Sequence, residues 1–276
     1  MKTLSRIVLL LASVLYLSGC KNGIVSYDTA DYQFADSTDC VYFTINLQLP
    51  SAKSGPAAQV RDTLLAAMVR QMERFGMEDE PHRLVPYSGV DSGIDSAAAY
   101  YGRQMLDFVD SMARQDRDGR LQYTTFFPSW EYNVAITKIA ESDKFIVFKS
   151  SDYIYMGGAH GGVTGAGDIT FSKTDGKPVR TIIDRSRCAD MQDILRAGLQ
   201  SYFDECGDEQ GMDYLFLDDD GIPLPAWEPS LSDSGVVFVY QQYEIAPYAA
   251  GMPSFTVPYG KMMEFLTDEA SCLVNE

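Results

Sequence analysis

The chain has 276 residues, of which 46% are hydrophobic, and it carries 39 acidic against 22 basic residues, a formal net charge of −17. This apolar content is too high for a disordered protein, and the negative charge argues against a nucleic-acid binder, because phosphates require Lys and Arg. The length suits one large domain or two small ones.

The first segment has the pattern of an export signal. Two basic residues and no acidic residue precede the apolar run 7–17, which is too short to span a bilayer permanently. The run leads into Leu-Ser-Gly-Cys at 17–20, which resembles the bacterial lipobox. We therefore predict a signal peptide over 1–19 and lipidation of Cys20. The alternative is an ordinary signal peptide with an accidental cysteine.

Processing of this kind changes the charge and the location. The mature chain would keep 20 basic against 39 acidic residues, a net charge of −19. Its acyl chains would anchor it to a membrane, and we expect the periplasmic face of the outer or inner membrane of the cell envelope.

The first half of the mature chain shows both strand-like and helix-like patterns. Runs of β-branched and aromatic residues predict strands, and apolar residues three and four positions apart predict helices. In chain order the expected elements are a flexible tether, a strand, two helices and two strand-like segments: 20–37, 41–49, 57–75, 95–115, 121–140 and 144–155.

The second half has more turn signals. Asp-Gly between strand-like segments is a strong hairpin signal, and it occurs at 175–176 and again at 220–221. The expected elements are a hairpin, a helix, a second hairpin, two strands and a closing helix: 168–171 with 178–183, 189–203, 215–217 with 222–224, 235–240, 255–257 and 259–266.

Strands and helices mix along the chain without regular β-α-β alternation. This favours an α+β fold with a largely antiparallel sheet and two to three packed helices. The sequence has no internal repeat and no long Pro/Ser-rich linker. We therefore expect an accessory half over 38–140 and a C-terminal half over 141–276 to pack together as one unit.

Four cysteines remain in the mature chain, Cys40, Cys188, Cys206 and Cys272. An exported compartment permits disulfides, and four cysteines allow three pairings, among which the sequence does not choose. The alternative is four free thiols. No Cys-x-x-Cys occurs, and the acidic run at 218–220 lacks the alternating ligands of a calcium loop, so we expect neither a metal site nor a cofactor.

Two segments are distinctive. Residues 155–162 read Tyr-Met-Gly-Gly-Ala-His-Gly-Gly, and residues 235–251 read Gly-Val-Val-Phe-Val-Tyr-Gln-Gln-Tyr-Glu-Ile-Ala-Pro-Tyr-Ala-Ala-Gly. Together they resemble the RsiV-like extracytoplasmic domain family, which includes the lysozyme-binding domain of an anti-sigma factor and the accessory domain of some peptidoglycan deacetylases. The resemblance covers roughly 144–266, with an accessory half before it. It implies a compact, RsiV-like α/β fold without fixing one function.

Neither activity of that family carries over directly. The anti-sigma role needs a cytoplasmic segment and a transmembrane helix, and the sequence shows neither. The deacetylases use a separate metal-dependent domain, whereas the histidines of this sequence, His82 and His160, form no His-x-x-x-His pair.

The first candidate site is the glycine-histidine segment, with Gly157, Gly158, His160 and Gly161. Glycine permits close backbone approach, so N–H groups there could bind an anion or a glycan carbonyl. His160 could carry a proton or recognise a polar group. The alternative is a tight β-bulge whose histidine bonds the neighbouring strand.

The second candidate site contains Tyr243, Glu244 and Tyr248. Glu244 could pair with Asp152 or Asp168 for glycoside hydrolysis, provided that the fold brings the carboxylates to a suitable separation. The alternative is a structural turn in which the tyrosines pack and Glu244 accepts backbone hydrogen bonds.

These observations favour a non-enzymatic, membrane-anchored lipoprotein that binds a protein or peptidoglycan ligand. Lysozyme-like muramidases are the sharpest candidates, because many are basic and opposite net charges speed encounter. The alternative is a cell-wall sugar or peptide hydrolase, or a deacetylase, that uses His160 and nearby acids. We expect no nucleic-acid partner.

Overall fold

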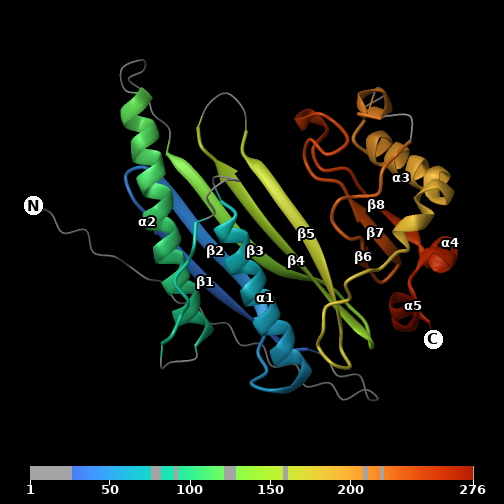
Figure 1. The fold of residues 1–276 in the computed structure, drawn as a ribbon, viewed down its shortest axis with the longest axis horizontal. Helices are drawn as coiled ribbons and strands as arrows, with labels where there is room; N and C mark the ends of the chain where they lie inside the picture. Colours follow the sequence, from blue (N-terminus) through green and yellow to red (C-terminus); the bar gives the residue numbers. More distant parts are fainter. Residues whose placement is uncertain are drawn as a thin grey trace, which may run out of the picture.

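The computed structural model describes residues 27–75, 82–89, 93–120, 129–157, 161–207, 211–217 and 221–275. The predicted signal peptide and Cys20 lie outside these residues. Within them, eight strands form two sheets with helices packed beside each, so the fold is mixed α+β, as Figure 1 shows. None of the described helices combines the length and the apolar character needed to cross a membrane.

The larger sheet holds five strands side by side in chain order. They are β1 (Thr29–Ser37), β2 (Val41–Pro50), β3 (Trp130–Glu141), β4 (Phe145–Tyr155) and β5 (Val163–Ser172). Neighbours run antiparallel except β2 and β3, which run parallel. A parallel pair needs a crossover, and this one contains α1 (Gly55–Glu73) and α2 (Ile94–Arg120).

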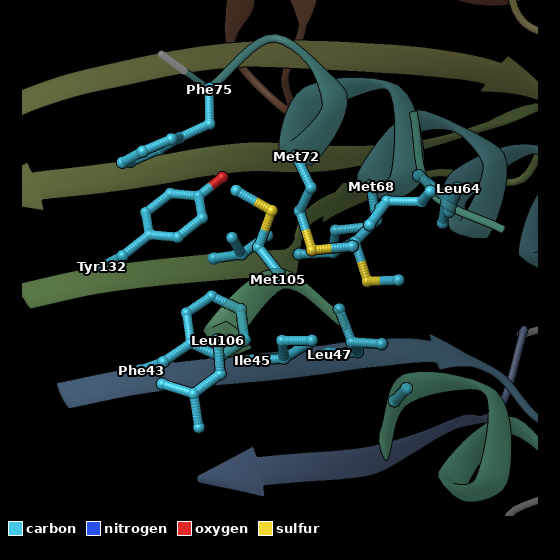
Figure 2. Packing of buried hydrophobic residues seen from close by; sticks show 14 of the residues in the cluster. Phe43, Ile45, Leu47, Leu64, Met68, Met72, Phe75, Met105, Leu106 and Tyr132 are labelled. Carbon is cyan, nitrogen blue, oxygen red and sulfur yellow. The ribbon is translucent and has the colours of Figure 1, made fainter. Parts of the chain in front are cut away.

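Both helices pack on one face of this sheet, which we call the helix face; the opposite face is the open face. The predicted apolar stripe of α1 is fully buried there, from Val60 through Leu64 to Met72. Figure 2 shows methionines of both helices against the aromatic and aliphatic side chains of β2 and β3. The alternation of β2 explains this core, because every second residue from Val41 to Leu49 is buried.

A smaller sheet forms a second layer with its own core. Its strands are β6 (Ser230–Leu231), β7 (Gly235–Val239) and β8 (Ser254–Pro258), all antiparallel. Its helices are η1 (Arg185–Met191), α3 (Gln192–Glu205), η2 (Gly211–Tyr214), η3 (Tyr248–Ala250), α4 (Tyr259–Met262), η4 (Met263–Phe265) and α5 (Asp268–Val274). Leu195, Leu199 and Phe203 of α3 are buried, as the predicted helix requires.

Strand β4 connects the two cores. Successive side chains of a strand point to opposite faces, and Phe145–Phe148 are four consecutive buried residues. Ile146 and Phe148 belong to the core under α1 and α2, whereas Phe145 and Val147 belong to the core of the smaller sheet. The expected division after residue 140 therefore does not separate the cores, because the first core extends into β4 and β5.

The expected tether is wrong from residue 29 onward, because Thr29–Ser37 form the edge strand β1. The strand pairs with β2 along its whole length. Only Tyr32 and Phe34 supply large apolar side chains toward the core, between acidic and amide residues. Two apolar positions are too few to show a clear period in the sequence, although they suffice to place an edge strand.

The first predicted hairpin of the second half forms in shortened form, and the second does not form. After the turn at Gly176 the chain returns antiparallel to β5, with a bridge between Phe171 and Pro178 and a hydrogen bond from the Val179 N–H to the Thr170 carbonyl at 2.8 Å, but it forms no further strand there. Residues 215–217 and 222–224 also form no strand, and the acidic run 218–220 between them lies outside the described residues. Prolines follow or interrupt these segments and remove the N–H groups that a ladder needs. The expected single sheet is consequently two sheets within the described residues.

A buried ion pair fastens the start of the described chain to one end of the larger sheet. The Lys173 side chain is only 4% exposed, and its Nζ lies 2.8 Å from Glu141 Oε1. The same oxygen accepts a hydrogen bond from the Tyr27 N–H at 2.9 Å. Burial by itself would raise the pKa of Glu141, but the hydrogen bonds donated to its carboxylate hold that pKa below its ordinary value of 4.5.

We expect Lys173→Met to lower the free energy of unfolding by about 3 kcal/mol, because it leaves a half-buried carboxylate without its main cation. The control is Lys177→Met, which removes an exposed ion pair with Asp175 and should cost well under about 1 kcal/mol. Denaturant unfolding at neutral pH measures both. Equal stability of the two variants would contradict the assignment.

The same site predicts a pH dependence. Because the folded-state pKa of Glu141 is lowered, its ionised form stabilises the fold above pH 4.5, and this contribution is lost as the pH falls through the folded-state value. The stability difference between the parent protein and Glu141→Gln should therefore be full at neutral pH and shrink below pH 4.5. A constant difference would show that ionisation of Glu141 is not its source.

Candidate functional site

The glycine-rich segment connects β4 to β5 in a hairpin at the far end of the sheet from Lys173. Gly157 has a left-handed backbone, with φ of 79°, which disfavours any side chain there. Gly158 and His160 lie outside the described residues, so the predicted roles of His160 stay predictions. Gly161 and Gly162 lead into β5.

Two tyrosine rings explain why the last glycines of this segment have no side chain. A β-carbon on Gly162 would lie 2.3 Å from the Tyr153 ring, and one on Gly161 would lie 2.5 Å from Tyr248 Oη. The Tyr248 hydroxyl also donates a hydrogen bond to the Gly162 carbonyl at 2.8 Å. The structure therefore brings Gly161 and Tyr248, predicted in separate sites, into contact.

The turn after β7 covers the free edge of β5. The Gln241 side chain accepts a hydrogen bond from the Ala166 N–H at 3.0 Å and donates one to the Ala166 carbonyl at 2.7 Å. The Gln242 side chain accepts one from the Thr164 N–H at 2.8 Å. These amides bond β5 as a sixth strand would, and they protect an edge that would otherwise pair with other chains.

Glu244 holds this turn together. One carboxylate oxygen accepts the Gln241 N–H and the other accepts the Ala226 N–H, both at 2.6 Å. Within the described residues these two backbone groups are its only hydrogen-bond donors. Both oxygens are therefore engaged in fixing the chain, which favours the structural alternative for Glu244 over a catalytic role.

Tyr243 is the exception in this well-bonded turn. Its backbone is left-handed, with φ of 66°, and it is the only described residue other than glycine with a positive φ. Its side chain is 55% exposed, and its ring centroid lies 5.8 Å from that of Tyr248. The turn thus presents a tyrosine to solvent at a backbone cost of about 1–2 kcal/mol.

The carboxylates proposed to pair with Glu244 lie on opposite faces of the sheet. Asp152 alternates with Phe148 and Ser150 on the helix face, whereas Asp168 lies on the open face, where it accepts a hydrogen bond from Ser230 at 2.8 Å. Burial raises the pKa of both acids, against the opposing effect of their hydrogen bonds. Glu244 could therefore share a face of the sheet with only one of these acids, and both of its own oxygens already accept backbone N–H groups.

Trp227 extends the aromatic surface along β5. A β-carbon on Gly167 would lie 1.5 Å from the indole ring, so the ring lies directly against the strand backbone. The side chain is still 39% exposed.

The turn after β7, Trp227 and the glycines before β5 together form one surface, which we call the edge surface. It contains Gly161, Gly162, Trp227, Gln241, Tyr243 and Tyr248. Trp227, Gln241 and Gln242 were not predicted as site residues. For the two glutamines, the signal in the sequence was their position directly after a buried strand.

The remaining ionisable groups of the described chain do not suggest a cofactor site. No cluster of three or more His, Cys, Asp or Glu residues in the described ranges could hold a metal ion. The four cysteines whose disulfide pairing the sequence left open are free thiols. Cys40 is buried, Cys188 is half-buried, and Cys206 and Cys272 are exposed.

Because the Trp227 ring occupies the space beside Gly167, we expect Gly167→Ala to lower the free energy of unfolding by about 1–3 kcal/mol. The matched control is Gly260→Ala in α4, where a β-carbon meets no atom within 4 Å and stability should change little or rise slightly. Thermal unfolding of both variants measures the effect. A Gly167→Ala variant as stable as the control would contradict the contact.

Comparison with known proteins relates this part of the chain to a family. Residues 187–260 match the family described as "Protein of unknown function (DUF3298)". The fold is similar to the crystal structure of a DUF3298 family protein from Pseudomonas aeruginosa PAO1, with 15% identity and a TM-score of 0.57, over 88% of this chain and 94% of that chain. A search of curated proteins gave no match.

A second solved structure agrees. It is a member of the same family from Bacteroides fragilis NCTC 9343, with 15% identity and a TM-score of 0.59, over 87% of this chain and 94% of that chain. The matched residues 187–260 hold all of α3, all of the smaller sheet and the turn of the edge surface. This part of the chain therefore carries the DUF3298 sequence pattern, and the chain shares the fold of two solved members of that family.

Proposed function

We propose that this protein is a lipid-anchored, non-enzymatic binding module of the cell envelope that binds a protein or peptidoglycan ligand through the edge surface. Lysozyme-like muramidases are the sharpest candidates. The lipid anchor at Cys20 and the finer RsiV-like assignment belong to the proposal. The DUF3298 match over 187–260 supports a domain of this general kind without naming a ligand.

The observation that carries the proposal is the conformation of Tyr243. A bulky residue with positive φ is uncommon, and such strained residues cluster at functional sites. Here the strain does not serve packing, because more than half of the side chain is exposed. Tyrosine offers a large, rigid contact area with a polar tip, which suits recognition. An exposed and strained tyrosine beside Tyr248 therefore supports a binding role.

Net charge supports a basic partner. The full chain carries −17, and opposite charges accelerate association while making it sensitive to salt. Exposed charges more than about 10 Å apart are largely screened at 0.1 M salt. A basic muramidase is one partner with the required charge, and its encounter with this chain should slow as salt rises.

Binding can be measured by calorimetric titration of residues 21–276, the predicted mature protein without its lipid, with a basic lysozyme at low and moderate salt. We expect binding that weakens with salt and falls at least about tenfold in Tyr243→Gly. This variant removes the ring at a position whose positive φ glycine adopts without strain.

The matched control is Phe216→Ala, which removes an exposed aromatic ring outside the edge surface and should leave the affinity unchanged. Another basic protein of similar size tests specificity. The muramidase proposal fails if lysozyme does not bind at low salt, or if the other basic protein binds equally well.

The enzymatic alternative needs His160 and a nearby acid. Glu244, the acid that both predicted carboxylate pairs require, has both oxygens engaged by backbone N–H groups. We therefore expect peptidoglycan fragments incubated with residues 21–276 to keep their masses in mass spectrometry. Turnover that disappears in His160→Ala, with the circular dichroism spectrum retained, would instead establish the hydrolase or deacetylase.

A further inference from the structure

We propose that the open face of the five-stranded sheet is a second binding surface, and that it binds an uncharged glycan chain through the C–H faces and hydroxyl groups of its sugar rings. The surface consists of Tyr42, Thr44, Glu131, Asn133, Tyr153 and Tyr155. It goes beyond the proposed function, because it assigns another ligand class to a surface that adjoins the edge surface at Tyr153, whose ring lies against Gly162.

The two faces of the sheet differ sharply in chemistry. On the helix face, β2 and β3 bury apolar residues such as Ile45 and Val134. On the open face, the same strands present mainly polar residues, which are exposed or half-buried. They are Tyr42, Thr44, Asn46 and Gln48 on β2 and Glu131, Asn133 and Thr137 on β3, with the small Ala135 as the one apolar exception. A face meant for a further protein layer would be apolar.

The register places these side chains in two rows across three strands. In the first row, Tyr42 lies opposite Glu131, and Glu131 lies opposite Tyr155. Because adjacent strands lie about 4.8 Å apart, the two tyrosines lie roughly 10 Å apart with the carboxylate between them. In the second row, Thr44 lies opposite Asn133, and Asn133 lies opposite Tyr153, so polar groups again lie beside an aromatic ring.

Hydrogen bonds orient the polar groups between the tyrosines. The Thr44 hydroxyl donates to Asn133 Oδ1 at 2.6 Å, and Asn133 Nδ2 donates to Glu131 Oε1 at 2.8 Å. Such a network fixes the direction of each remaining donor and acceptor before a ligand arrives. A preorganised set of this kind loses less conformational entropy on binding.

This combination fits a sugar polymer. Tyrosine rings provide flat apolar surfaces for the C–H faces of sugar rings, and amide and carboxylate groups bond their hydroxyls. The two rows lie on one face of the sheet and so form a platform for an extended chain. Glu131 at its centre disfavours nucleic acid, and charged groups at the centre disfavour a protein partner.

The smaller sheet covers only one end of this face. Phe145 and Val147 are buried beneath it, and Asp168 bonds Ser230 there. Toward the hairpin, Tyr153 and Tyr155 are half-buried, and across β2 the Tyr42 side chain is 48% exposed. The platform therefore stays accessible within the described part of the chain and is bounded on one side by the second layer.

The test is co-sedimentation of residues 21–276 with two insoluble, uncharged glycan probes, chitin and cellulose. We expect retention on both probes. Tyr42→Ala should weaken retention about tenfold, because it removes one stacking ring from an exposed position where folding is little affected. Tyr42→Phe keeps the ring and should bind within about threefold of the parent protein.

Two further variants separate this surface from the edge surface. Tyr243→Gly should leave glycan retention unchanged, and Phe216→Ala serves as the control for loss of an exposed ring. The inference is overturned if neither probe retains the protein, or if Tyr42→Ala binds as well as the parent. It is also overturned if Tyr42→Ala weakens lysozyme binding but not glycan binding, because the face would then belong to a protein partner.

Discussion

Burial of β4 on both faces is the constraint on which the rest of the fold depends. An antiparallel sheet usually keeps one face for water, but Phe145–Phe148 supply alternate side chains to two different cores. The strand therefore ties the helical layer to the smaller sheet. It also fixes the β4–β5 hairpin at its far end, beside the turn of the edge surface, although that turn lies 75 to 86 residues later in the chain.

Strongly patterned segments could be predicted from the sequence, and weakly patterned ones could not. Helix α1 shows its apolar stripe as a helical period in the sequence. The four apolar residues of β4 and the run Gly235–Val239 are visible as short continuous apolar runs. Strand β1 is held mainly by main-chain pairing with β2 and by two aromatic residues, and neither leaves a repeat. The division into two sheets depends on contacts distant in sequence, which no local pattern encodes.

The candidate site shows the same limit. The sequence singled out Gly161, Tyr243 and Tyr248, and the structure brings them to one surface because the turn after β7 lies along β5. The residues that produce this arrangement were missed. The side-chain amides of Gln241 and Gln242 form the hydrogen bonds to β5 that a neighbouring strand would form. A glutamine can bond many backbone groups, so its residue type does not predict this role until the partner strand is known.

The anchoring of Tyr27 has a geometric consequence for a tethered protein. Tyr27 is bound at the Glu141 and Lys173 end of the sheet, whereas the edge surface begins beyond the other end of β4, an 11-residue strand that spans roughly 35 Å. If Cys20 carries the proposed lipid, the attached end of the described chain and the hairpin end of the edge surface would lie at opposite ends of the sheet, so the length of β4 would separate a bound partner from the point of attachment.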